Sequence, residues 1–120
     1  MKVVMDMIFN HVGSFHWWIR DLPSKDWIHK FDEFTRTNYK SSTYMDPYAS
    51  ETDRMIMEKG WFDVTMPDLN QDNPLVETYL IQTSLWWIAF SDLDGIRMDT
   101  YPYPQPDMMS RWAKRVTDEF

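Results

Sequence analysis

Charged and polar side chains stand in or directly after two short apolar stretches. In the first stretch, strand alternation would place Asp6 and Asn10 on the same side, with His11 just beyond the strand. In the second, Arg97 and Asp99 are two residues apart and so point the same way. Because functional side chains of α/β folds gather where parallel strands end, we expect both groups to meet at one edge of a sheet.

These residue types could support displacement chemistry. Burying an Asp and an Arg in strands is costly unless they pair, so we expect a buried Asp6–Arg97 ion pair. A guanidinium beside a carboxyl favours its ionised form, so Arg97 would keep Asp99 negatively charged. Such a carboxylate, at a rim lined with aromatics, can attack the anomeric carbon of a sugar. A purely architectural ion pair remains the alternative.

The elements that must position these residues follow a βαβα order. The apolar run 2–9 predicts a strand covered on both faces, and a second short strand is expected over 96–99. A helix is predicted over 74–91, and Asp107 is expected to cap another helix. This order predicts an α/β fold with a parallel sheet, but periodicity leaves an open doubly wound sheet and a closed barrel both possible.

Both predicted helices carry apolar residues at spacings of three and four. Asn73 as N-cap and Pro74 at the first helical position start the first helix. Its predicted core face consists of Val76, Tyr79, Leu80, Thr83, Trp87 and Phe90. That of the second helix consists of Met109, Trp112, Ala113, Val116 and Phe120.

The stretch from about 12 to 72 is far too long for an ordinary strand-to-helix connection. It is rich in Trp, Tyr, Asp, Ser and Thr, with short helical turns expected around 15–20 and 53–58. We interpret it as a functional excursion or small inserted subdomain. Trp17 and Trp18 could line a sugar cleft or serve packing.

Composition narrows the classes of partner. With 12 basic and 19 acidic residues the net charge is −7, which argues against nucleic acid or an anionic membrane surface as partner. The 17% aromatic content suits sugar stacking as well as a core. The absence of Cys excludes disulfides and thiolate metal sites, and no apolar run approaches the ~18 residues of a bilayer span.

Three short motifs carry a family resemblance. Asp6-x-x-x-Asn10-His11 resembles the first signature of the α-amylase family, glycoside hydrolase family 13. Residues 95–99 resemble its nucleophile-bearing signature, and residues 66–70, Met-Pro-Asp-Leu-Asn, are similar to a signature near the end of inserted domain B. The order and the gap between the motifs match the family. The resemblance covers the whole chain, residues 1–120, from the third strand to the fourth helix of a (β/α)8 TIM barrel.

The resemblance implies retaining hydrolysis or transfer at α-glucosidic bonds of starch-derived oligosaccharides. By resemblance, Asp99 is the nucleophile and Arg97 positions and ionises it. His11 matches a residue that hydrogen-bonds the sugar beside the cleaved bond, and Asp6 matches the carboxylate that braces the Arg. Tyr101, two residues after Asp99, is a candidate for stacking on substrate.

A calcium ion is a possible cofactor. Asn10 matches a position that ligates calcium in many family members, and calcium favours oxygen ligands such as the Asn side-chain carbonyl. No organic cofactor is implied.

Two sequence features indicate which subfamily of the α-amylase family this chain resembles most. Met66-Pro-Asp-Leu-Asn70, with Thr100-Tyr-Pro102, looks most like neopullulanase or cyclomaltodextrinase-type members, including periplasmic ones, so a periplasmic or secreted location is suggested. The usual pattern has a different residue where Asp68 stands, which points partly toward oligo-1,6-glucosidase-like enzymes.

The family's general acid Glu follows the next barrel strand, and Glu119 lies in a predicted helix and does not match it. Because the chain opens in a strand and ends mid-helix, we expect it to be an internal fragment of the catalytic domain. Because the acid Glu is absent from it, we expect this fragment to be inactive alone.

Two other functions stay open. A non-catalytic amylase-like protein could bind glycans without cleaving them. Separately, Asp92-x-Asp94-Gly95 resembles the strand-end signature of haloacid-dehalogenase-type phosphatases, in which the first Asp attacks phosphorus with Mg²⁺ assistance. That second function requires residues 85–91 to form a strand, whereas their periodicity favours a helix.

Overall fold

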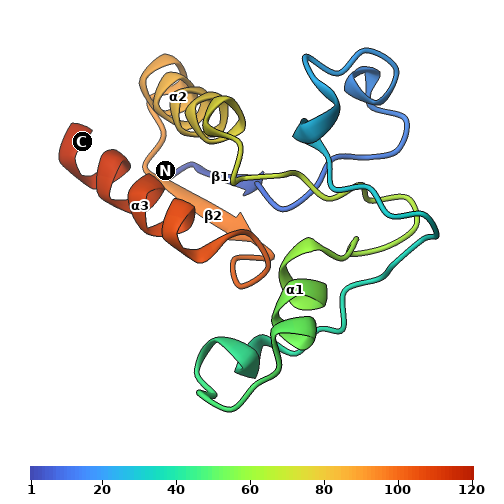
Figure 1. Cartoon of the computed structure of the whole chain (residues 1–120). Helices are drawn as coiled ribbons and strands as arrows, with labels where there is room; N and C mark the ends of the chain where they lie inside the picture. Colours follow the sequence, from blue (N-terminus) through green and yellow to red (C-terminus); the bar gives the residue numbers. More distant parts are fainter.

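The computed structural model describes residues 1–120, with two strands and three α-helices (Figure 1). In chain order these are β1 (Val4–Ile8), α1 (Glu51–Lys59), α2 (Pro74–Ser91), β2 (Gly95–Asp99) and α3 (Pro106–Glu119). Three short 3-10 helices, Trp17–Ile19, Lys25–Trp27 and Ser41–Tyr44, lie between β1 and α1. The predicted order of strand, excursion, helix, strand, loop and helix is confirmed.

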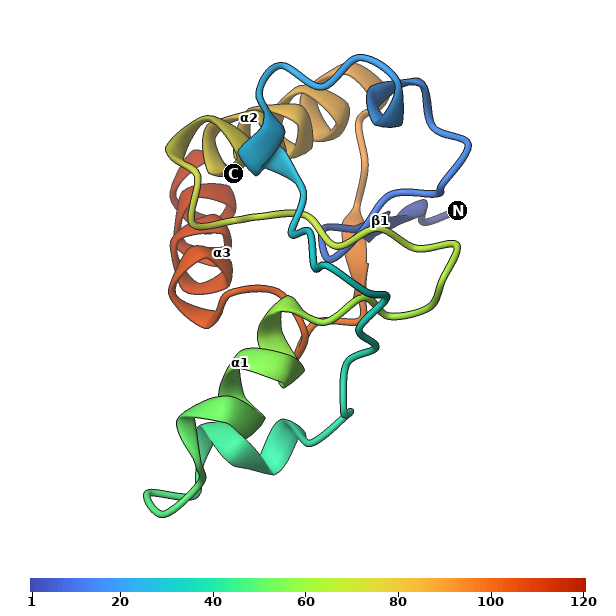
Figure 2. The same cartoon turned by 45° about the vertical axis from the view of Figure 1, so that its right-hand side comes forward.

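Strands β1 and β2 lie side by side, with α2 and α3 both on one side of them (Figure 2). The strands pair in parallel, Asp6 with Arg97 and Ile8 with Asp99. Side chains alternate across the sheet, so Met7 and Met98 face the core that α2 and α3 complete. Asp6, Arg97 and Asp99 therefore share the opposite face. Because the strands run parallel, their carboxyl ends lie at one edge, as the sequence predicted.

The expectation that the strand over 2–9 is covered on both faces is wrong for this chain. The strand is limited to Val4–Ile8, and within it only Met7 is buried. The physical reason is that α2 and α3 both pack on the Met7 side, which leaves Val4, Asp6 and Ile8 uncovered.

Helix α2 has the predicted bounds, Pro74–Ser91. The side chain of Asn73 accepts a hydrogen bond of 2.9 Å from the amide of Leu75, and Pro74 occupies the first turn, where its missing N–H is tolerated. The helix ends at Asp92, which adopts a left-handed conformation with φ of 50°.

The predicted core face of α2 is partly wrong. Trp87 and Phe90 are exposed, as is Tyr79. The buried positions are Val76, Leu80, Ile81, Ser84 and Leu85. Because α2 is apolar on nearly all sides, periodicity could not choose the stripe, and the position of α3 decides it.

Helix α3 begins at Pro106 and is capped by Gln105, whose side chain accepts a hydrogen bond of 2.6 Å from the amide of Met108. The prediction that Asp107 is the cap is wrong, because a proline at the first helical position moves the cap to the residue before it. The indole of Trp112 donates to Ser84 of α2 at 2.9 Å, which joins the two helices inside the core.

The excursion between β1 and α2 has two parts (Figure 1). The part up to about residue 30 lies beside α2, where Trp18 and Trp27 pack edge-on against each other and against Tyr79. Trp18 is buried and Trp17 exposed, so only Trp17 is free to meet a ligand. The other part carries α1 and projects away from the sheet. Whether the excursion is an inserted domain stays a prediction.

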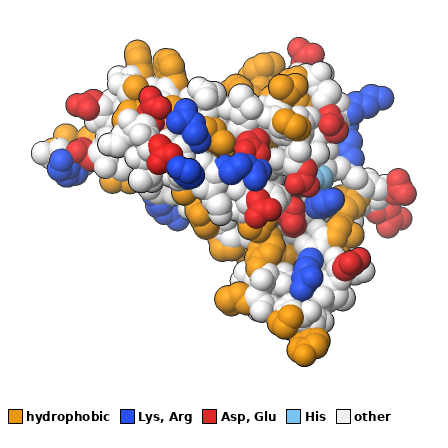
Figure 3. All heavy atoms as spheres, turned by 60° about the vertical axis from the view of Figure 1, so that its left-hand side comes forward, with side chains coloured by type: hydrophobic (Ala, Val, Ile, Leu, Met, Phe, Trp, Pro, Cys, Tyr) orange, Lys and Arg blue, Asp and Glu red, His pale blue; other side chains and the backbone are white.

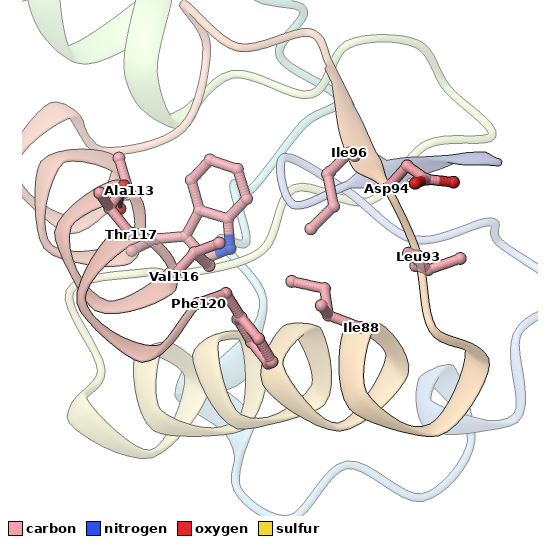
Figure 4. A pocket seen from close by; sticks show the side chains of 10 residues that line it. Ile88, Leu93, Asp94, Ile96, Ala113, Val116, Thr117 and Phe120 are labelled. Atoms are coloured by element: carbon pink, nitrogen blue, oxygen red, sulfur yellow. Dashed lines mark hydrogen bonds between the residues drawn. The ribbon is translucent and has the colours of Figure 1, made fainter. Parts of the chain in front are cut away.

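Acidic and basic side chains alternate over the surface with hydrophobic ones among them (Figure 3). An apolar pocket lies between α2, α3 and the start of β2, where Ile88, Ile96 and Val116 converge (Figure 4). It opens at the amino end of β2, the edge opposite Asp99. None of the helices has both the length and the apolar character that crossing a bilayer requires.

Candidate active site

Arg97 bridges two carboxylates at the candidate site. Its Nη1 donates to Asp6 Oδ2 at 2.6 Å, and its Nη2 donates to Asp99 Oδ1 at 2.7 Å. These hydrogen bonds raise the pKa of Arg97 above its usual value, and the bond to Asp6 has the larger effect. Strand register explains the geometry, because Asp6 is the direct partner of Arg97, and Asp99 follows Arg97 by two residues on the same face.

The predicted ion pair is present, but the prediction that it is buried is wrong for this chain. The side chains of Asp6 and Arg97 are 57% and 61% exposed, and that of Asp99 is 32% exposed. Both helices pack on the opposite face of the sheet, so solvent reaches the bridge.

His11 lies at the same edge, three residues past the end of β1. Burial lowers the pKa of its imidazole, and the nearby negative charge of Asp99 partly offsets this. The His11 imidazole packs on Phe62, which in turn packs against Tyr103 in the loop after β2, so His11 lies beside the segment that follows Asp99. That His11 binds substrate stays a prediction. Asn10 Nδ2 lies 3.2 Å from His11 Nδ1.

Tyr101 is exposed in the turn after β2. The residue before it, Thr100, has a φ of 50°, a costly conformation for a β-branched side chain. Thr100 also donates from its hydroxyl to the carbonyl of Asp99 at 2.8 Å. The chain thus turns sharply where the candidate nucleophile ends β2.

Sequence reasoning missed a group of aromatic residues beside His11. Phe62 stacks on the His11 imidazole, and Tyr39 and Tyr103 pack edge-on against Phe62. These residues come from distant parts of the chain, so no local pattern signals their meeting.

Sequence reasoning also missed a buried pair. His29 Nδ1 lies 2.6 Å from Asp68 Oδ2. Burial raises the pKa of Asp68 well above its usual value, and burial followed by the charge of Lys59 lowers the pKa of His29 to about 4. Burial therefore favours the neutral form of each partner. The pair joins the first part of the excursion to its last residues, which lead into α2.

The phosphatase reading is contradicted. Residues 85–91 are helical, and Asp92 caps the end of α2 instead of ending a strand. Asp94 accepts hydrogen bonds from Lys2 Nζ and the amide of Val3, at the amino end of the sheet. Neither carboxylate lies where parallel strands present catalytic groups.

Residues 1–118 match the family described as the catalytic domain of alpha amylase. The chain belongs to the α-amylase family. Its sequence is 30% identical over 99 residues to the intracellular maltogenic amylase of Bacillus subtilis, covering 82% of this chain and 15% of that protein. It is 27% identical over 108 residues to an oligo-1,6-glucosidase of Halalkalibacterium halodurans, covering 82% of this chain and 19% of that protein.

Solved structures agree with this family assignment. The alpha-amylase of Geobacillus thermoleovorans, crystallised with acarbose, is 36% identical with a TM-score of 0.76, over 100% of this chain and 24% of that one. An Anoxybacillus alpha-amylase is 33% identical with the same TM-score of 0.76, over 99% of this chain and 23% of that one. These structures confirm the prediction that the chain forms part of a (β/α)8 barrel. The chain spans about a seventh to a quarter of the lengths of these relatives.

In this α-amylase-family chain, two buried side-chain oxygens near the end of β1 and before α2 are candidates for binding a cation. Asn10 Oδ1 and Asp68 Oδ1 are buried without hydrogen-bond partners. Their segments are joined, since the Leu69 amide donates to the Asn10 carbonyl at 2.9 Å. The Asn10 carbonyl oxygen suits calcium, which takes roughly 6–8 oxygen ligands, whereas Asp68 would have to ionise to bind the ion, against the effect of its burial. No group of three or more His, Asp or Glu side chains gathers to hold a metal, so this chain offers two oxygens and not a whole site.

Proposed function

We propose that the protein containing this chain is a retaining glycoside hydrolase that acts on α-glucosidic bonds of starch-derived oligosaccharides, with Asp99 as nucleophile. The observation that carries the proposal is the Arg97 bridge between Asp6 and Asp99, at the sheet edge where His11 follows the end of β1. The Arg97 guanidinium holds the Asp99 carboxylate through one of its two oxygens, Oδ1. Membership of the α-amylase family supports the choice of substrate class.

Each of these residues would have its own role in retaining hydrolysis. The Asp99 carboxylate attacks the anomeric carbon, the bond to the leaving oxygen breaks, and a glycosyl-enzyme ester forms. The leaving oxygen takes a proton from a carboxylic acid. Water later hydrolyses the ester. His11 would donate a hydrogen bond to a sugar hydroxyl, and Tyr101, exposed in the following turn, would stack on the ring.

We further propose that the proton donor lies outside these 120 residues and that the chain is inactive alone. A retaining enzyme needs its two carboxyl groups about 5 Å apart. Asp6 is held by Arg97, and Glu119 lies at the end of α3 paired with Arg115. Neither side chain is free to protonate a leaving group beside Asp99.

A neopullulanase-like or maltogenic preference is the narrower proposal, supported by the likeness to maltogenic amylases at 29–30% identity. Cleavage of cyclomaltodextrin or pullulan by the full-length protein would support it, and activity confined to isomalto-oligosaccharides would contradict it. We also propose calcium as a structural ion that Asn10 helps to bind.

The deciding experiment compares Asp99→Asn with Asp92→Asn in the full-length protein, with maltotriose hydrolysis as the assay. Loss of a nucleophile costs a factor on the order of 10⁴ or more in kcat, whereas Asp92, at a helix end, can be replaced with little effect. Wild-type-like activity of Asp99→Asn would refute the assignment. A wild-type protein that binds maltotriose without cleaving it would favour the glycan-binding alternative.

A further inference from the structure

The His11 imidazole packs against Phe62 in an offset, nearly parallel arrangement. The two ring centroids are 5.7 Å apart, with an angle of 23° between the planes. Phe62 belongs to the excursion, whereas His11 follows β1. Packing of two nearly parallel rings restricts rotation of the smaller ring about its Cβ–Cγ bond.

Phe62 is itself held in place. Tyr39 and Tyr103 meet its ring edge-on, with centroids 5.5 Å and 5.2 Å away. The Tyr39 hydroxyl donates to the Phe62 carbonyl at 2.7 Å, so the backbone is fixed as well as the ring. Tyr39 has a φ of 58°, a conformation that non-glycine residues adopt only when their surroundings enforce it. The three rings connect the excursion to the loop after β2.

The edge of the imidazole is fixed by Asn10. An amide NH₂ can only donate, so the 3.2 Å contact from Asn10 Nδ2 makes His11 Nδ1 an acceptor. In the neutral ring the proton then resides on Nε2. Asn10 is buried at 1% exposure, so its amide is held among its neighbours.

We propose that Phe62 is a positioning residue for His11. By packing beside the imidazole, it keeps Nδ1 on the Asn10 amide and directs Nε2–H toward the sugar. Phe62 acts through His11 and makes no contact of its own with substrate. The inference rests on the proposed function, because it assigns the residue that orients a sugar-binding group of that site.

A double-mutant cycle in the full-length protein tests this relationship with maltotriose as substrate. Phe62→Leu keeps an apolar side chain but removes the aromatic ring, and should lower kcat/KM about tenfold. Phe62→Tyr keeps the ring and should stay within about twofold of wild type. In a His11→Ala background, Phe62→Leu should cause no further loss, because the residue it orients is gone. Losses that multiply in the double variant would overturn the proposal.

Phe34→Leu is the matched control. Phe34 lies in the same excursion and packs edge-on against Trp61, with centroids 6.1 Å apart, and it makes no ring contact with His11. Its replacement should leave kcat/KM within about twofold of wild type. An equal loss from Phe34→Leu and Phe62→Leu would show a general packing effect and contradict the proposal.

A measurement without substrate separates this inference from the proposed function. Nitrogen-15 NMR of His-labelled protein reports which ring nitrogen of His11 is protonated. We expect a single Nε2–H form in wild type and a mixture of both forms in Phe62→Leu. Unchanged spectra in the variant would refute the positioning role. A wild-type protein that cleaves no α-glucan, yet shows the expected spectra, would refute only the proposed function.

Discussion

Arg97 and Asp6 are direct partners in the parallel sheet, and their side chains meet at 2.6 Å on the face that the helices leave open. The same guanidinium donates through its other terminal nitrogen to Asp99. One side chain therefore fixes the spacing between two carboxylates on neighbouring strands. The planar fork of Arg suits this task, since its donors point in fixed and different directions.

Arg97→Lys should retain the positive charge but lose the bridge. A lysine ammonium is a single compact charge and cannot hold Asp6 and Asp99 in the geometry of the guanidinium. We expect kcat of the full-length protein on maltotriose to fall about 100-fold, since misplacing a reacting group by about 1 Å has that effect. Arg115→Lys, at an exposed pair with Glu119 on α3, is the control and should change kcat little. Wild-type kcat in Arg97→Lys would contradict the bridging role.

Gly60→Ala should destabilise the excursion. An added Cβ would lie 2.6 Å from both the Ile56 carbonyl oxygen and the Thr37 amide nitrogen, which are backbone atoms that cannot move aside easily. We expect a loss of roughly 1–3 kcal/mol in the free energy of unfolding, measured by urea denaturation of the full-length protein. Gly13→Ala is the control, since nothing lies within 4 Å of its added Cβ. Equal unfolding midpoints for the two variants would rule out this steric explanation.

Calcium should raise the Tm of the full-length protein, and chelation with EGTA should lower it. At a free concentration of about 100 times its Kd, an ion that binds only the folded state adds about 2.7 kcal/mol of stability. Asn10→Ala should abolish the calcium-dependent shift, because it removes a buried oxygen that has no other partner. Asn38→Ala, which removes an unrelated hydrogen bond to the Asp53 carbonyl, should keep it. An identical Tm in calcium and in EGTA would contradict the proposal that the protein binds calcium.

Glu58→Gln should stabilise the folded protein near neutral pH. Burial, reinforced by the charge of Asp72, raises the pKa of Glu58, so the folded state holds this proton more tightly than the unfolded state does. Stability is then lost as pH rises from the unfolded value through the folded one, and Gln removes that loss. The Tm of the variant should exceed that of wild type at pH 7, and the difference should disappear below about pH 4. A constant difference at all pH values would indicate a cause other than ionisation.

Part of the candidate site could be predicted because strand geometry is local. The pairing of parallel strands forces their carboxyl ends to one edge, so Asp6, Arg97 and Asp99 had to approach one another once the βαβ order was known. The exposure of these three side chains could not be predicted in the same way, since it depends on what packs on the sheet face opposite the helices. The second missed feature, the His29–Asp68 contact, joins residues far apart in sequence, and no periodicity marks it.

The sequence by itself determined the bounds of α2, through Asn73 and Pro74, and the alternation of elements that makes the sheet parallel. Tertiary structure decided which stripe of α2 is buried, and that Phe62 lies against His11. The difference has one physical cause. Caps, prolines and side-chain alternation act within a few residues, whereas stacking and burial depend on distant segments that only the folded chain brings together.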